Sequence, residues 1–98
     1  MKVVFTEPAL ADLDEILTYT DENYPHLADS IERRIHDVLA QIRRWPRNAR
    51  TIDDRPGVRA VPLARYPYRI YYRIEGKVIE VLHIRHTSRQ PWADDGTR

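Results

Sequence analysis

The stretch Tyr68–Trp92, YRIYYRIEGKVIEVLHIRHTSRQPW, decides the fold of this 98-residue chain. It predicts two strands, Tyr68–Glu75 and Val78–Thr87, because tyrosine, isoleucine and valine favour a pleated strand. The two residues between them, Gly76-Lys77, are typical of a type II′ turn, which begins with glycine. The stretch therefore predicts an antiparallel hairpin, and the remaining chain is expected to cover one of its faces.

Strict alternation assigns the side chains of this hairpin to two faces. The first face is the more apolar, and we expect helices to pack on it; it holds Tyr68, Ile70, Tyr72, Ile74, Ile79, Val81, His83 and Arg85. The second face mixes cations with apolar groups; it holds Arg69, Tyr71, Arg73, Glu80, Leu82, Ile84 and His86. Arg73 is expected to pair with Glu80 across the strands. We predict that this second face stays uncovered and binds a partner.

Length and composition are those of one small domain, which we expect to span residues 1–98. The chain has no cysteine, which excludes disulfides and thiolate metal sites. No apolar run approaches the roughly 20 residues that span a bilayer. Met1-Lys2 leads directly into a strand, so no signal peptide is predicted. We expect a soluble cytoplasmic protein that is not bound to a membrane.

The small net charge of +1 hides a strong asymmetry along the chain. Residues 1–32 hold eight acidic residues and one lysine, a balance of −7, whereas residues 33–98 have a balance of +8. All basic residues except Lys2 and Lys77 are arginines, whose planar guanidinium suits bidentate contacts with phosphate or carboxylate. The C-terminal part is therefore expected to meet an anionic partner.

The other segments predict a strand followed by two helices and a third strand. Residues 2–6 form a short apolar strand, and Thr6 can cap the helix that ends near Tyr24-Pro25. Leu10, Leu13, Ile16, Leu17, Thr20 and Tyr24 mark the apolar stripe of that first helix. Ala28, Ile31, Ile35, Val38, Ile42 and Trp45 mark the stripe of a second helix, residues 27–45.

Residues 46–57 are predicted to be a loop, and Val58–Leu63 a strand that Pro62 confines to an edge or a bulge. The order β-α-α-β-β-β predicts an α+β fold in which a helical hairpin packs on one face of a small antiparallel sheet. The position of the first strand in that sheet is left open.

No motif of metal or nucleotide chemistry occurs in the chain. His83 and His86 are three residues apart on a strand and point to opposite faces, so we expect neither a metal site nor a cofactor. His83 is expected to be a hydrogen-bonded, half-buried histidine. A metal-free catalytic interpretation assigns the acid or base to His86 and the phosphate clamps to Arg69 and Arg89.

The combination of PYRIYYRI, a short turn, VIEVLHIRH and the ending Arg89-Gln90-Pro91-Trp92 resembles the RelE/ParE superfamily of type II toxin–antitoxin toxins. The resemblance covers residues 2 to about 92 and implies a small α+β toxin. It also implies a cognate antitoxin that wraps the toxin with an acidic or amphipathic C-terminal segment. Contact with operator DNA would be made through that antitoxin alone.

Within the superfamily, the ending HIRHTSRQPW is more similar to ParE-like members, which poison DNA gyrase without established catalytic residues. The resemblance therefore implies a toxin that binds gyrase and is not an enzyme. The alternatives are a RelE-like, ribosome-dependent mRNA endonuclease that uses Arg69, His86 and Arg89, or a non-toxic remnant that binds only its antitoxin.

Two sets of site residues follow from this interpretation. The antitoxin is expected to contact Arg69, Tyr71, Arg73, Leu82 and Ile84 on the second face. The target is expected to contact Arg85, His86, Arg89 and Trp92 near the end of the chain.

Overall fold

The computed structural model describes residues 1–87, which form one sheet and two helices. In chain order the elements are β1 (Lys2–Phe5), α1 (Glu7–Asn23), α2 (Pro25–Arg44), β2 (Arg50–Thr51), β3 (Val58–Pro62), β4 (Tyr68–Glu75) and β5 (Val78–His86). The predicted α+β order is confirmed, with the addition of β2 inside the segment that was predicted to be a loop. The predicted contributions of Arg89 and Trp92 lie outside the described residues.

The sheet formed by residues 1–87 is mixed. Its strand order is β1-β5-β4-β3-β2, in which β1 runs parallel to β5 and the other neighbours are antiparallel. The prediction of an entirely antiparallel sheet is therefore wrong at the β1 edge. The two helices between β1 and the later strands supply the long crossover that a parallel pair needs.

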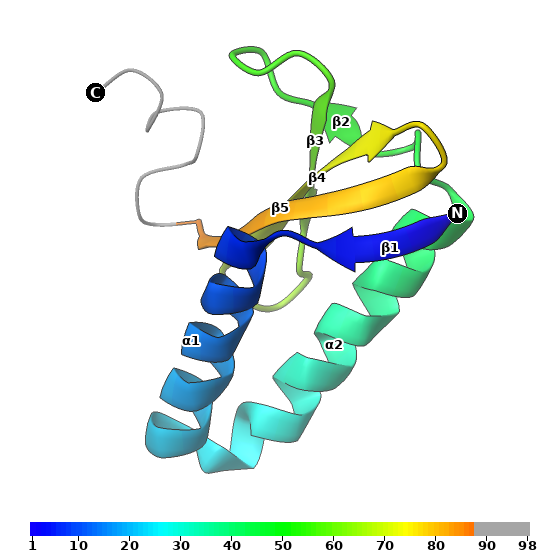
Figure 1. Ribbon diagram of the computed structural model, residues 1–98. Helices are drawn as coiled ribbons and strands as arrows, with labels where there is room; N and C mark the ends of the chain where they lie inside the picture. The colour runs from blue at the N-terminus through cyan, green and yellow to red at the C-terminus, as the bar shows by residue number, and fades with distance from the viewer. Residues whose placement is uncertain (88–98) are drawn as a thin grey trace.

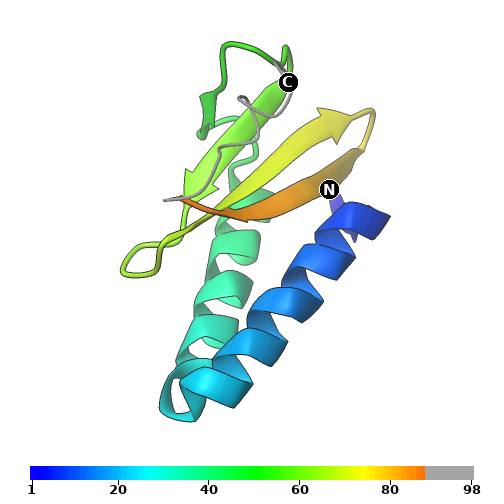
Figure 2. The same ribbon diagram turned by 90° about the vertical axis from the view of Figure 1, so that its left-hand side faces the viewer.

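Both helices pack on the same face of the sheet (Figures 1 and 2). Ile31, Ile35, Val38 and Ile42 of α2 are buried, as the apolar stripe predicts. They pack in one core with Ile70 and Tyr72 of β4 and with Ile79, Val81 and Ile84 of β5.

Three positions of the predicted stripes are exposed. Leu10 is 52% exposed, Tyr24 is 47% exposed and Trp45 is 48% exposed. In α1 the fully buried Ala9 faces the sheet in place of Leu10. Tyr24 and Trp45 are the caps that follow α1 and α2, where the chain leaves the helical path.

Thr6 joins the start of α1 to the middle of β5. Its Oγ1 accepts a hydrogen bond from Ala9 N–H at 3.3 Å, which is the predicted helix cap. The Thr6 backbone N–H donates to the Val81 carbonyl at 3.0 Å. The Thr6 hydroxyl lies 3.0 Å from the Val81 carbonyl and 3.2 Å from the Leu82 carbonyl. The first turn of α1 is thereby fixed against β5.

Asp12 makes the second link between α1 and β5. Its Oδ2 accepts a hydrogen bond from Ile84 N–H at 3.0 Å and lies 3.0 Å from Nδ1 of His83. A carboxylate only accepts, so Nδ1 of His83 carries the proton in this contact. The prediction of a hydrogen-bonded, half-buried His83 is confirmed; its side chain is 18% exposed.

The turn between β4 and β5 follows the predicted chemistry. Gly76 has φ = +60°, the left-handed value that a type II′ turn requires at its first central residue. Among the described residues, Arg65 is the only non-glycine residue with a positive φ, so the φ of Lys77 is negative. This combination separates the turn from type I′, which needs a positive φ at both positions.

Within residues 1–87, neither helix has the length and apolar content needed to cross a membrane.

The Asp12 link can be tested by stability. We expect Asp12→Ala to lower the free energy of unfolding by about 1–3 kcal/mol, because the partly buried Ile84 N–H loses its acceptor. Urea denaturation should show a lower midpoint with an unchanged slope. Asp14→Ala is the matched control, since Asp14 is exposed on the same helix; an equal loss in both variants would contradict a specific link.

Candidate functional site

One face of the sheet carries no helix in the described chain (Figure 2). Arg69, Tyr71 and Arg73 lie on it, because the intervening Ile70 and Tyr72 belong to the core beneath the helices. The cross-strand partners of these three residues on β3 are Pro62, Ala60 and Val58. The prediction that β4 turns its arginines away from the helices is confirmed.

A β-bulge at Leu82 changes the face assignment in the second half of β5. Val81 pairs with Tyr72 and His83 pairs with Tyr71, so Leu82 has no cross-strand partner of its own. An extra residue of this kind inverts the alternation beyond it. The strict alternation assumed from the sequence is therefore wrong after Val81.

The bulge changes the predicted faces of three residues. Ile84 and His86 pair with Ile70 and Tyr68 on the helix side, and Ile84 is only 3% exposed. Their predicted place on the uncovered face is wrong. Arg85, which was predicted on the helix side, instead pairs with Arg69 on the uncovered face.

The corrected surface, here called the open face, consists of Arg50, Ala60, Pro62, Arg69, Tyr71, Arg73, Glu80 and Arg85. Arg73 Nε donates to Glu80 Oε1 at 2.8 Å, as predicted. The hydrogen bond and the negative charge of Glu80 raise the pKa of Arg73. Because Glu80 offsets one arginine, the open face keeps a net positive charge from Arg50, Arg69 and Arg85.

Arg69 and Arg85 lie directly opposite each other on neighbouring strands of this surface. Like charges at opposite positions of neighbouring strands destabilise a sheet. Such a pair suits a surface on which a partner supplies carboxylate or phosphate groups.

Tyr71 lies at the centre of the open face and is only 3% exposed. It borders a hollow of about 370 Å³ that is lined by Arg50, Ile52, Ala60, Pro62, Arg69 and Tyr71. Apolar walls beneath guanidinium groups provide contacts for an amphipathic segment. The sequence pattern did not place Arg50, Ile52, Ala60 or Pro62 on a binding surface, although residues 46–57 contain three arginines, one of which is Arg50.

His86 lies in a different environment, on the helix side of the sheet. Its ring meets that of Tyr68 edge to face, with 5.2 Å between the ring centres. The hollow beside it is lined by Glu15, Ile16, Tyr19, Tyr68, Ile84 and His86. The sheet therefore separates His86 from Arg69. These two members of the predicted catalytic group do not meet at one phosphate. Among residues 1–87, no three His, Asp or Glu side chains are grouped so that they can hold a metal ion.

Comparisons with known proteins give a family and a fold. Residues 3–91 match the family model described as the ParE toxin of the type II toxin–antitoxin system parDE. The structure is similar to a chain of the chromosomal ParDE toxin–antitoxin system from Pseudomonas aeruginosa. The identity is 27%, the TM-score is 0.66, and the match covers 88% of this chain and 95% of that chain.

Two structures of the Escherichia coli toxin RelE share the fold at lower identity. The isolated toxin is 17% identical, with a TM-score of 0.64 and coverage of 98% of this chain and 94% of that chain. A RelE mutant in complex with a peptide of the antitoxin RelBc is 16% identical, with a TM-score of 0.66 and coverage of 99% and 93%. A search of curated proteins gave no match.

The opposed arginines generate a test of stability. We expect Arg69→Gln to raise the free energy of unfolding by up to about 1 kcal/mol, because it removes the repulsion from Arg85. The gain should shrink in high salt, which screens exposed charges. Arg43→Gln, an exposed arginine of α2, serves as the control in the same denaturation series; a loss of stability in Arg69→Gln would show that Arg69 holds the sheet together.

Proposed function

This chain belongs to the ParE toxin family of type II toxin–antitoxin systems, and from that premise we propose that it blocks growth by binding DNA gyrase. We further propose that a cognate antitoxin neutralises it by placing an acidic, amphipathic segment on the open face. In this proposal the chain acts as a binding protein and not as a nuclease.

The observation that carries the choice between gyrase and mRNA is the separation of Arg69 from His86. Cleavage of RNA without a metal needs an acid or base and a phosphate clamp at the same scissile group. Arg69 lies on the open face, whereas His86 pairs with Tyr68 on the helix side. This arrangement supports a toxin that works by occupying a surface of its target. The family match to ParE supports the same choice.

The proposed antitoxin surface consists of the arginines and the aromatic centre of the open face. Arg69 and Arg73 supply charge, and the half-buried Leu82 lies at the bulge. Tyr71 is only 3% exposed and contributes as part of the wall of the hollow on this face. Ile84 is left out of the proposal because it is buried in the core. The proposed contact with the target remains at the end of β5, where Arg85 lies on the open face and His86 on the helix side.

The identity of the target is tested by asking which process the toxin inhibits, DNA supercoiling or translation. We expect inhibition of DNA supercoiling by purified gyrase and a DNA-damage response in cells, while translation continues. A reconstituted translation reaction with the same toxin preparation is the parallel measurement. Cleavage of mRNA on the ribosome, with supercoiling unaffected, would replace gyrase by the RelE-like target. Normal growth without antitoxin would leave antitoxin binding as the remaining activity.

The antitoxin surface is tested by charge reversal. We expect Arg69→Glu to weaken the affinity for the cognate antitoxin at least about tenfold, because a repulsive contact replaces an attractive one. Isothermal titration calorimetry of the purified toxin measures this loss. Arg43→Glu on α2 is the matched control and should leave the affinity within about twofold; equal affinities for both variants would reject the open face as the antitoxin surface.

A further inference from the structure

One flank of α2 carries a row of polar residues that neither the core nor the open face uses. Ser30, Arg33, Arg34, Asp37, Gln41 and Arg44 recur at spacings of three and four and so share one side of the helix. Two hollows lie along this flank, where α2 passes β3 and the loop between β3 and β4. We call the flank and its two hollows the α2 groove.

The first hollow of the α2 groove is basic. It is lined by Ser30, Arg33, Arg34, Asp37, Arg65 and Tyr66, so three guanidinium groups face a single carboxylate. Arg65 has φ = +81°, a strained conformation that residues with a Cβ rarely adopt. Strained residues of this kind are concentrated at functional sites. The chemistry of the lining suits carboxylate groups, which arginine binds with two parallel hydrogen bonds.

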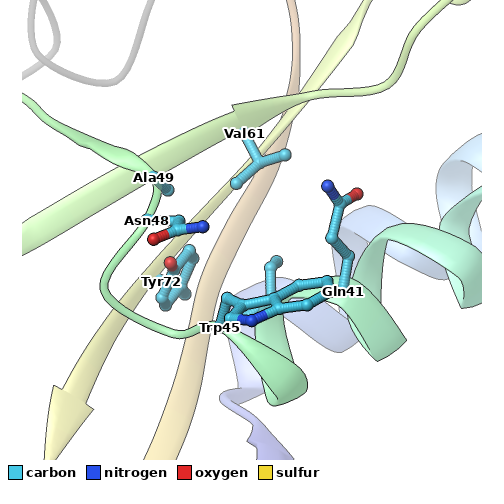
Figure 3. Close-up of a pocket in the computed structure, with 7 residues that line it drawn as sticks. Gln41, Trp45, Asn48, Ala49, Val61 and Tyr72 are labelled. Atoms are coloured by element: carbon cyan, nitrogen blue, oxygen red, sulfur yellow. The ribbon is translucent and has the colours of Figure 1, made fainter.

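The second hollow of the α2 groove is apolar and has walls that are held in place. Figure 3 shows Trp45 at the end of α2 facing Tyr72, Ala49 and Val61, with Gln41 and Asn48 on the rim. The hydroxyl of Tyr72 donates to the Pro46 carbonyl at 2.5 Å. Arg59 Nη1 donates to the carbonyls of Arg47 and Ala49 at 3.0 and 2.7 Å. These bonds fix the segment that closes the hollow.

Trp45 is available for contact with another molecule. It is 48% exposed, and the guanidinium carbon of Arg44 lies 4.6 Å from the centre of its ring. A tryptophan stacked by arginine beside a preformed apolar hollow is a typical anchor point of an interface. The hollow has a volume of about 130 Å³ and so suits one apolar side chain.

The α2 groove and the open face meet at the short strand β2. Ala49 lines the apolar hollow of the groove, and the next residue, Arg50, lines the hollow of the open face. β2 is two residues long and forms the edge of the sheet. A segment bound to the open face can therefore pass over this edge and enter the groove.

We propose that the antitoxin segment continues from the open face across β2 into the α2 groove. It places an apolar side chain against Trp45 at the apolar hollow, and carboxylates against Arg33, Arg34 and Arg65. This inference rests on the proposed neutralisation by an acidic antitoxin segment. From Arg34 to Trp45 the helix rises about 16 Å, which an extended segment spans with about five residues. The antitoxin is thus expected to carry its acidic residues about five positions from the apolar anchor.

The experiment compares variants of the groove in the full-length toxin with its cognate antitoxin by isothermal titration calorimetry. We expect the double variant Arg33→Gln/Arg34→Gln to bind about tenfold more weakly, with a smaller dependence on salt. Trp45→Ala should lose more than tenfold. Arg43→Gln, which removes the same charge from another side of α2, is the control and should stay within about twofold. Circular dichroism and thermal unfolding establish that each variant is folded, and the double arginine variant changes only the helix flank.

The outcomes separate this inference from the proposal on which it rests. Wild-type affinity in both groove variants, together with weak binding by Arg69→Glu, would reject the groove and leave the open face as the antitoxin surface. Wild-type affinity in all three would reject both. The double arginine variant is also tested for binding to a 20-base-pair duplex DNA. A loss of DNA binding with unchanged antitoxin affinity would overturn the proposal and assign the groove to phosphate groups.

Discussion

The bulge at Leu82 is the constraint on which the rest of the structure depends. An extra residue in β5 breaks the ladder with β4, and α1 supplies the bonds that hold the break in place. Thr6 contacts the carbonyls on both sides of it, at Val81 and Leu82. Asp12 accepts from the backbone N–H of Ile84, two residues further along the strand. Because β1 pairs with β5 only as far as Val81, the second half of β5 would present a bare edge without this cover. The start of α1 thus covers the free edge of β5 and also fixes the register of β5 with β4.

That register decides the chemistry of both faces of the sheet. Beyond the bulge, Ile84 completes the core, His86 turns toward Tyr68, and Arg85 is placed opposite Arg69. A continuous ladder would have buried a guanidinium group under the helices and exposed Ile84 on the other side. Burying an unpaired charge costs far more than interrupting a ladder by one residue. The bulge is therefore the less costly way to fit this sequence onto a sheet that is covered on one face, and the cationic open face is its result.

Much of this arrangement follows from patterns in the sequence. The stripe Ile31, Ile35, Val38 and Ile42 defines α2, the Gly76-Lys77 turn defines the hairpin, and Thr6 marks the start of α1. The bulge does not follow, because Ile79 and Val81 alternate regularly with their neighbours and nothing in the residue pattern marks an extra residue at Leu82. The choice depends on a hydrogen-bond donor from Thr6 and an acceptor from Asp12, each more than 70 residues away. The parallel pairing of β1 with β5 could not be predicted either, because the apolar residues of β1 fit either edge of the sheet. Trp45 was misplaced because the helical period continues in the sequence for one residue beyond the end of the helix.

The same features that make the surface useful also make it costly to the isolated chain. Arg69 and Arg85 repel each other across β4 and β5, and Arg65 keeps a strained backbone. A carboxylate from the proposed partner would offset the repulsion between the two guanidinium groups. A partner that binds only the folded chain adds its binding free energy to the stability of the fold. In the proposal above, the acidic antitoxin segment would therefore add stability to the fold as well as block its surface. The charge asymmetry between the acidic α1 and the arginine-rich segments that follow it has the same consequence, because it directs that partner to the sheet and away from α1.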